Sequence, residues 1–194
     1  MVQKLVVATG NPGKLAEMQE YLIDLPWQLE LKPKSIDVDE TGTTFIENAR
    51  LKASEVAKAV GKWSIADDSG LMVDALDGAP GLYSARYGNT DQERINRLLG
   101  ELGDTDQRQA KFICAIAIAN PDGEIVLETE GICPGEILTS PCGDGGFGYD
   151  PIFYVPSEQK TFAQMLPETK GKVSHRGVAF SQLMPELQQL SKSL

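Results

Sequence analysis

The segment Leu5–Lys14, LVVATGNPGK, constrains this chain most, because an apolar run passes through a glycine turn into a helical pattern. Leu5–Ala8 is typical of a short buried strand. Gly10 and Gly13 allow a tight turn and a close approach of the backbone to a ligand, and Pro12 stands where a helix can begin. The apolar residues that follow share one helical face: Leu15, Met18, Leu22 and Leu25. The segment therefore predicts a strand, a turn and a helix in succession.

This arrangement suits a phosphate group. A strand end, a glycine turn and a helix N-terminus would bring unpaired N–H groups and the positive end of a helix dipole beside Lys14. The segment matches neither the Walker A pattern GxxxxGK[ST] nor GxGxxG. An ordinary strand-to-helix turn explains the same pattern, so this segment alone leaves both interpretations open.

The totals describe an ordinary globular chain. At 194 residues it fits one domain, or one domain with two lobes. No apolar run approaches the ~20 residues that a membrane helix needs, and no secretory signal is expected at the N-terminus. The cysteines are too few and too irregularly spaced for a disulfide framework or a zinc site. We therefore expect a reduced, cytoplasmic protein that does not span a membrane.

The net charge of −10 argues against a polymeric nucleic-acid partner, which would require a basic face. It leaves a single nucleotide possible, because a divalent cation, a few lysines and backbone N–H groups can hold a triphosphate in an acidic protein. Excess carboxylate also suits a hard metal ion, although it is more often a solvated surface.

The remaining patterns indicate a mixed α/β order with a β-hairpin in the second half. Strands are predicted at Trp27–Lys32, Trp63–Ala66, Gln109–Ala119, Glu124–Cys133 and Ile152–Val155. Helices are predicted from Pro12 to near Pro26, from Thr44 to Gly61, over Thr90–Leu102 and from Ser174 onward. In the second of these helices Asn48 and Lys52 share a face that is not the apolar one. In the last, we expect Val178 or Phe180, with Leu183, Leu187 and Leu190, to face inward.

Asp67–Gly70, DDSG, is expected to follow a buried strand directly, where α/β proteins place functional loops. Two adjacent carboxylates cost electrostatic energy unless a cation or hydrogen bonds compensate. A divalent metal would do so, with Glu40 of the acidic loop Asp37–Gly42 as a second contributor. The alternative is that the two aspartates only cap a turn.

A second group of polar residues lies late in the chain. The one histidine, His175, stands with Arg176, Lys170 and Lys172 in a basic cluster of an acidic protein. A lone histidine is more often structural than functional, but the cluster favours function. The glycine-rich segment Gly145–Pro151 holds two aromatic rings, which serve either as core plugs or as a stacking surface for a base. Neither a GxSxG nucleophile elbow nor thiol chemistry is supported.

Six segments together resemble the inosine triphosphate pyrophosphatases, the Ham1-like proteins. They occur in the family's order and span nearly the whole chain: TGNPGK at Thr9–Lys14, ETGTTFIENARLKA at Glu40–Ala53, ADDSGL at Ala66–Leu71, GAPGLYSARY at Gly78–Tyr87, GGFGYDPIF at Gly145–Phe153 and SHRG at Ser174–Gly177. Any one of these segments is weak evidence for the family, whereas six in the family's order are strong evidence.

The resemblance implies an elongated α/β fold, a mixed β-sheet with flanking helices, in which residues 1–194 form one domain whose two lobes surround a central substrate cleft. It implies a homodimer that uses Mg²⁺ to hydrolyse ITP, dITP and XTP to the monophosphate and pyrophosphate, clearing them from the nucleotide pool.

The resemblance also assigns the site by position. It implies that Glu40 and Asp68 bind the metal and that Asp68 is the general base. The implied substrate contacts are Thr9, Gly10, Asn11, Pro12, Gly13, Lys14, Lys52 and Ser69 at the phosphate end, and Phe147, Gly148, Tyr149, Asp150, Lys170, His175 and Arg176 at the nucleoside end.

Three other functions remain to be distinguished. A Maf-type nucleotide pyrophosphatase would run the same reaction with another base preference, but the SHR and FGYDP segments speak against it. A nucleotide-binding module would not turn over, although Asp68, Glu40 and Lys14 are all present. A metal-dependent sugar phosphohydrolase would show no purine selectivity.

Overall fold

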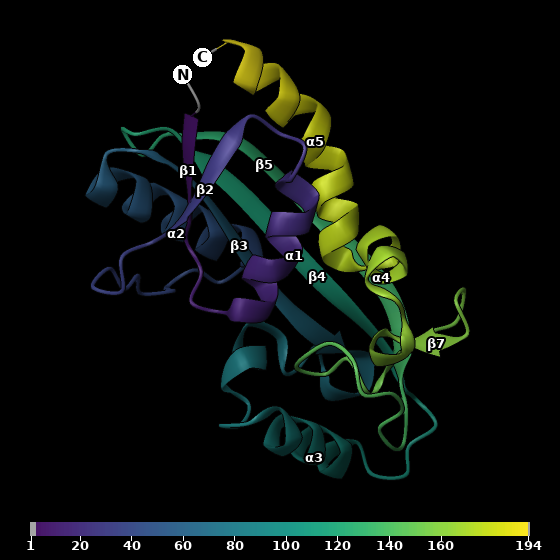
Figure 1. The fold of residues 1–194 in the computed structure, drawn as a ribbon. Helices are drawn as coiled ribbons and strands as arrows, with labels where there is room; N and C mark the ends of the chain where they lie inside the picture. Colours follow the sequence, from purple (N-terminus) through teal and green to yellow (C-terminus); the bar gives the residue numbers. More distant parts are fainter. Residues whose placement is uncertain (1–2, 194) are drawn as a thin grey trace. The chain divides into compact units, whose positions relative to one another are not determined.

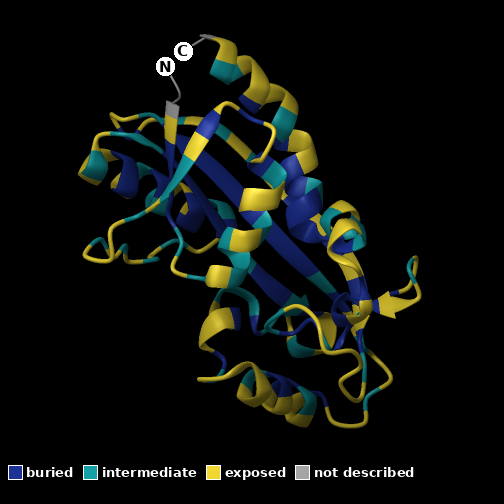
Figure 2. Cartoon of the chain, viewed as in Figure 1, coloured by how far each residue is buried: buried dark blue, intermediate teal, exposed yellow. Residues whose placement is uncertain are grey.

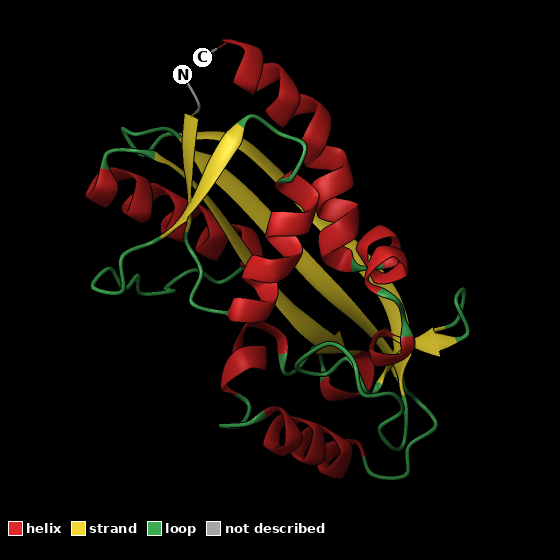
Figure 3. Cartoon of the chain, in the orientation of Figure 1, coloured by secondary structure: helices red, strands yellow, loops and turns green. Residues whose placement is uncertain are grey.

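The computed structural model describes residues 3–193 and has a mixed α/β fold, as predicted (Figure 3). Within these residues, seven strands form one open mixed sheet in the order β2-β1-β3-β4-β5-β6-β7. The strands are β1 (Gln3–Val7), β2 (Trp27–Leu31), β3 (Trp63–Val73), β4 (Gln109–Ala119), β5 (Ile125–Ile137), β6 (Phe153–Val155) and β7 (Lys160–Thr161). The α-helices are α1 (Pro12–Leu22), α2 (Phe45–Val60), α3 (Asp91–Leu102), α4 (Pro167–Val173) and α5 (His175–Ser193), and short 3-10 helices lie at Asp74–Leu76, Gly81–Arg86 and Phe162–Gln164 (Figure 1).

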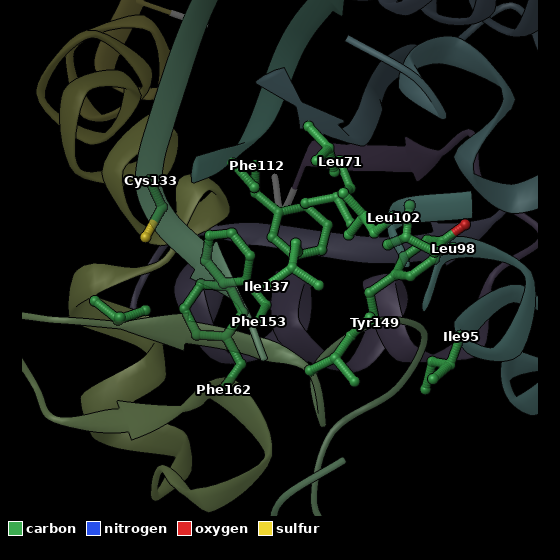
Figure 4. Packing of buried hydrophobic residues seen from close by; sticks show 14 of the residues in the cluster. Leu71, Ile95, Leu98, Leu102, Phe112, Cys133, Ile137, Tyr149, Phe153 and Phe162 are labelled. Carbon is green, nitrogen blue, oxygen red and sulfur yellow. The ribbon is translucent and has the colours of Figure 1, made fainter. Parts of the chain in front are cut away.

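The chain divides into two compact units, each with its own apolar core. Unit 1 comprises the residues up to Asp68, Cys114–Gly131 and the residues from Arg176 onward, and unit 2 comprises Ser69–Ile113 and Ile132–His175. In unit 1, side chains of α1 and α5 pack with those of β1, β3 and β4; this core includes Leu5, Met18, Ile65, Ile116, Phe180 and Leu183. In unit 2, α3 packs with three aromatic residues, Phe112, Phe153 and Phe162 (Figure 4). Strand β4 supplies residues to both cores and is buried over most of its length (Figure 2).

Strand β1 marks the point where the chain reverses its direction of winding. It lies between β2 and β3 and runs parallel to both. The chain leaves β1 through α1 to reach β2 on one side, and returns through α2 to β3 on the other. Ligands of open α/β sheets bind beyond the carboxyl ends of the strands at such a switch point. The segment Thr9–Lys14 begins at this end of β1.

Strand β3 is longer than expected, which corrects the prediction that DDSG is a loop after a short strand. Asp67–Gly70 lie inside β3, which continues through the buried residues Leu71 and Val73. The strand continues because its polar residues find partners without leaving the extended conformation. Side chains alternate between the two faces of a strand, so Asp67 and Asp68 point in opposite directions.

The other helix and strand predictions are mostly confirmed. Thr44 caps α2 by accepting a hydrogen bond from the Glu47 amide at 3.3 Å, and Gly61 ends that helix in the left-handed conformation at φ +62°. Strand β4 has the predicted extent, and helix α3 begins one residue later than predicted, at Asp91, with Thr90 as its N-cap. Helix α5 begins directly after Ser174, with Phe180 buried more fully than Val178.

Two boundaries were wrong, and two short elements were missed. Helix α1 ends at Leu22, so Leu25 is buried from the turn that follows rather than from the helix. Strand β5 continues to Ile137, because its last residues pair with β6. The short elements β7 and α4 were not expected, since two strand residues and about two turns of a mostly polar helix carry no clear hydrophobic period.

Cys114, Cys133 and Cys142 are free thiols. Burial raises the pKa of Cys114 and of Cys133 to about 12, so both are unreactive, while Cys142 is exposed.

Among residues 3–193, none of the helices is long and apolar enough to cross a bilayer.

Candidate functional site

The turn between β1 and α1 is built around Asn11. Asn11 stands before the first residue of α1 in an extended conformation, and its Oδ1 accepts hydrogen bonds from the amides of Gly13 at 2.9 Å and Lys14 at 3.2 Å. The Asn11 amide in turn donates to Thr9 Oγ1 at 3.1 Å. The predicted turn, with Pro12 opening the helix, is confirmed.

These hydrogen bonds correct one part of the phosphate prediction. The Gly13 and Lys14 amides are not unpaired, because asparagine is a strong N-cap and its side chain satisfies both. Gly10 borders open space, since a Cβ added there would have no atom within 4 Å. The positive charge at this turn is therefore supplied mainly by the ammonium group of Lys14.

Lys14 is held by the first of the two adjacent aspartates. Its Nζ lies 3.0 Å from Asp67 Oδ2, with the lysine side chain 15% exposed and that of Asp67 fully buried. Burial alone would raise the pKa of Asp67, but Lys14 and Arg176 outweigh it and hold that pKa well below its ordinary value. Asp67 is therefore a carboxylate, and two cations compensate its charge, the ammonium of Lys14 and the guanidinium of Arg176.

Arg176 is bound on two sides within unit 1. Its Nη2 donates to Asp67 Oδ2 at 3.0 Å, its Nη1 donates to Glu17 Oε2, and its side chain is only 2% exposed. These bonds join α5, β3 and α1. Sequence reasoning missed Glu17, because a glutamate in the middle of a helix looks like any solvated residue.

Asp68 belongs to a second cluster, on the α2 side of β3. Lys52 Nζ donates to Glu40 Oε1 at 2.7 Å and to Asp68 Oδ1 at 3.0 Å. The structure thus brings together the two predicted metal ligands and one predicted phosphate contact. Burial raises the pKa of Asp68, against the opposing effect of Lys52. The pKa of Lys52 is itself raised: burial acts to lower it, but Asp68 and Asp67 outweigh burial.

Asn48 completes this cluster and was not among the predicted site residues. It is 3% exposed, its Nδ2 donates to Asp68 Oδ2 at 3.2 Å, and its Oδ1 accepts from the Gly42 amide at 2.8 Å. Asn48 therefore ties the acidic loop to α2 and orients Asp68. The signal was present, because Asn48 and Lys52 are four residues apart on the polar face of a helix.

The glycine-rich segment of unit 2 is organised by Asp150. Its Oδ2 accepts from Lys170 Nζ at 2.6 Å and from the Phe147 amide at 2.9 Å, and the residue is 4% exposed. Lys170 Nζ also lies 4.8 Å from the centre of the Phe147 ring. The structure thus joins three predicted nucleoside-end residues into one group, with an aromatic ring held beside a cation.

Gly148 and Tyr149 have different surroundings. The Gly148 amide donates to Asp91 Oδ2 at 2.7 Å, in the first turn of α3. Tyr149 is 4% exposed, its hydroxyl donates to the Ser84 carbonyl at 2.9 Å, and burial raises its pKa. Tyr149 is therefore a core residue of unit 2, and its contact with a substrate stays a prediction.

His175 lies in the aromatic core of unit 2. Its ring stacks on Phe112 at 4.6 Å between centroids with 13° between planes, and the residue is 5% exposed. It immediately precedes Arg176, which belongs to unit 1. Ser69 follows Asp68 in β3 and is half-buried at the start of unit 2. Substrate contacts from both residues stay predictions.

Gly146→Ala is expected to lower the free energy of unfolding by about 1–3 kcal/mol. Gly146 has φ +75°, and a Cβ there would lie 1.9 Å from Asp150 Oδ2, so the carboxylate that holds Lys170 would have to move. The measurement is urea denaturation. Gly100→Ala is the matched control: an added Cβ meets no atom within 4 Å in the interior of α3, and the variant should be up to about 1 kcal/mol more stable. Equal stability of the two variants would contradict this view of the Asp150 cluster.

Comparisons with known proteins give matches over nearly the whole chain. The Ham1 family model matches residues 5–186. A dITP/XTP pyrophosphatase of a Nostoc species is 65% identical over 187 residues, covering 96% of this chain and 95% of the relative. A second protein of that name, from a Synechocystis species, is 68% identical over 180 residues and covers 93% of each chain. A solved HAM1 protein from Coxiella burnetii is 45% identical with a TM-score of 0.87, covering 96% of this chain and 99% of its own.

Proposed function

Because the chain belongs to the Ham1 family, we propose that it hydrolyses ITP, dITP and XTP to the nucleoside monophosphate and pyrophosphate. Relatives named dITP/XTP pyrophosphatase match nearly its whole length. The observation that carries the proposal is the cluster in which Lys52 joins Glu40 and Asp68. Such a cluster places a cation for phosphate beside a carboxylate that can activate water.

Glu40 and Asp68 fit Mg²⁺ as its protein ligands. Mg²⁺ prefers oxygen ligands and binds through one or two carboxylates together with substrate phosphates and water. The two carboxylates already converge on one cation, the Nζ of Lys52, at 2.7 and 3.0 Å. Within residues 3–193 there is no group of three or more His, Cys, Asp and Glu placed to hold a metal. When bound, Mg²⁺ would offset the negative charge that grows on the departing pyrophosphate.

In the reaction we assign proton transfer to Asp68. Its carboxylate orients a water molecule and accepts its proton while the water oxygen bonds to the α-phosphorus. The bond from the α-phosphorus to the bridging oxygen breaks, and the electron pair leaves with pyrophosphate. Lys14 and Lys52 offset the negative charge of the phosphates, and Asn48 keeps the Asp68 carboxylate in its orientation.

At the nucleoside end, selectivity would come from hydrogen-bond donors. Hypoxanthine and xanthine present a 6-keto acceptor where adenine presents an amino donor. We assign the donors to Lys170, His175 and Arg176, with Phe147 as a ring against which a base can stack. A buried donor that meets adenine would lose its partner at a cost of about 1–3 kcal/mol, so two such mismatches would discriminate about a hundredfold.

The test is pyrophosphate release from ITP, dITP, XTP, ATP and GTP, each with Mg²⁺ and with EDTA as the control. We expect fast turnover of the first three, at least about a hundredfold preference over ATP, and loss of turnover in EDTA. Absence of turnover on the whole panel would favour a nucleotide-binding module. Equal turnover of all five would keep the hydrolysis and contradict the assignment of the base-reading donors.

Two further properties are proposed from the family resemblance alone. We propose that the protein is a homodimer and that it acts in the cytoplasm. Sedimentation of the purified chain tests the first, since a monomer at micromolar concentration would contradict it. Fractionation of cells tests the second.

A further inference from the structure

The side chains of the two adjacent aspartates of β3 lie on opposite faces of the strand and have different partners. Asp68 points toward α2, where it meets Lys52 and Asn48. Asp67 points to the opposite face, the face on which Ile65 joins the core of unit 1. Asp67 is therefore not a second member of the Glu40–Asp68 pair, and the proposed reaction leaves it without a role.

Asp67 is nevertheless the centre of a buried chain of charges. Its Oδ2 lies 3.0 Å from Lys14 Nζ and 3.0 Å from Arg176 Nη2, and Arg176 is held in turn by Glu17. Cys114 Sγ lies 3.9 Å from the same oxygen. Four elements of unit 1 thus meet at one carboxylate: α1, β3, β4 and α5.

We propose that Asp67 is a positioning residue of the site: it holds the Lys14 ammonium at the phosphate turn, while Arg176 and Glu17 hold Asp67 in place. This rests on the proposed function. A lysine side chain is long and flexible, and fixing its ammonium in water costs conformational entropy. An anion that is itself rigid removes that cost before the substrate arrives, and this raises affinity without any new contact with the substrate.

Asp67 is suited to this task by its surroundings. Its side chain is fully buried, so water does not screen its attraction for Lys14, whereas the lysine remains 15% exposed and accessible from outside. The buried arginine makes up the charge balance: two cations, Lys14 and Arg176, meet two anions, Asp67 and Glu17. Asp67 Oδ2 is shared between Lys14 and Arg176, so the carboxylate holds the Lys14 ammonium without being devoted to it alone.

The experiment uses Asp67→Asn, which keeps the volume and removes the charge, and measures binding of inorganic pyrophosphate in Mg²⁺ buffer by calorimetry. We expect affinity to fall roughly tenfold, the loss of one charge-assisted contact. With dITP as substrate, KM should rise by a similar factor and kcat should change less. Lys14→Met should weaken pyrophosphate binding at least as much, and the double variant Asp67→Asn/Lys14→Met should bind no more weakly than Lys14→Met.

Cys114→Ala is the matched control, because it disturbs the packing around Asp67 without changing a charge. Its pyrophosphate affinity should remain within about twofold of that of the unaltered chain. If Asp67→Asn does not fold, Asp67→Glu keeps the charge but moves it along the side chain, and it should raise KM with little change in kcat.

Three results would overturn the proposal: unchanged pyrophosphate affinity in Asp67→Asn, effects of the Asp67 and Lys14 changes that multiply in the double variant, or an equal loss in Cys114→Ala. Pyrophosphate binding needs no turnover. A chain that binds pyrophosphate through Lys14 but hydrolyses none of the five nucleotides would refute the proposed function and still test the role of Asp67.

Discussion

Asp68→Asn is expected to lower kcat for dITP by roughly 10²–10⁴-fold, the usual contribution of a general base. The amide cannot accept the proton of the attacking water, and it is a poorer ligand for Mg²⁺ than a carboxylate. The change keeps the volume, and the amide oxygen can still accept one of the two hydrogen bonds, from Lys52 or from Asn48, so the fold should persist. Steady-state pyrophosphate release at saturating substrate measures this effect.

The matched control is Asp122→Asn, at an exposed aspartate in the turn between β4 and β5 of the same unit. It removes the same charge from the chain and should leave kcat within about twofold. Circular dichroism should show the same secondary structure for both variants. Turnover of Asp68→Asn near that of Asp122→Asn would refute the assignment of Asp68.

Arg176→Met is expected to lower the free energy of unfolding by about 3–5 kcal/mol, because it leaves the buried carboxylate of Asp67 and that of Glu17 without their arginine. For a chain of this size the corresponding fall in Tm is roughly 6–20 °C. Methionine has a similar length, so lost charge rather than a cavity dominates. Thermal unfolding followed by circular dichroism measures the change.

Arg50→Met provides the comparison, since Arg50 also makes a two-pronged ion pair, with both nitrogen–oxygen distances to Glu128 at 2.6 Å. Those two side chains are 45% and 40% exposed, so water screens the pair and its loss should cost about 0–1 kcal/mol. The difference between the two variants in the free energy of unfolding measures how much burial adds to the contribution of an arginine ion pair. If both lowered Tm equally, the buried charge network would not be a main source of stability in unit 1.

The parts of the candidate site that depend only on residues close together in the sequence were predictable. Asn11 before Pro12 indicates a helix cap, and a cap forms from neighbouring residues alone. Asn48 and Lys52 indicated a shared polar helix face, which the structure places on Asp68. The six family segments contain most of the lysines and carboxylates that the structure gathers into clusters, although Glu17 and Lys170 lie outside them.

The partners of these residues were not predictable, because each is supplied by a distant part of the chain. Nothing near Asp67 in sequence indicates that Arg176, which lies 109 residues away, neutralises it. The loop predicted at Asp67–Gly70 is absent because distant residues compensate the charges of its two aspartates. With Lys14 and Arg176 on one face and Lys52 on the other, both aspartates are compensated inside a continuous strand.

By itself, the sequence determined the local elements, the caps that begin and end helices, the family and the identity of the charged groups. Only the tertiary structure decided which cation meets which carboxylate, because long-range electrostatic pairing depends on distance and burial after folding rather than on spacing along the chain. Two neighbouring aspartates therefore look alike in sequence and differ in the structure, since the alternation of one strand turns one toward Lys52 and the other toward Lys14.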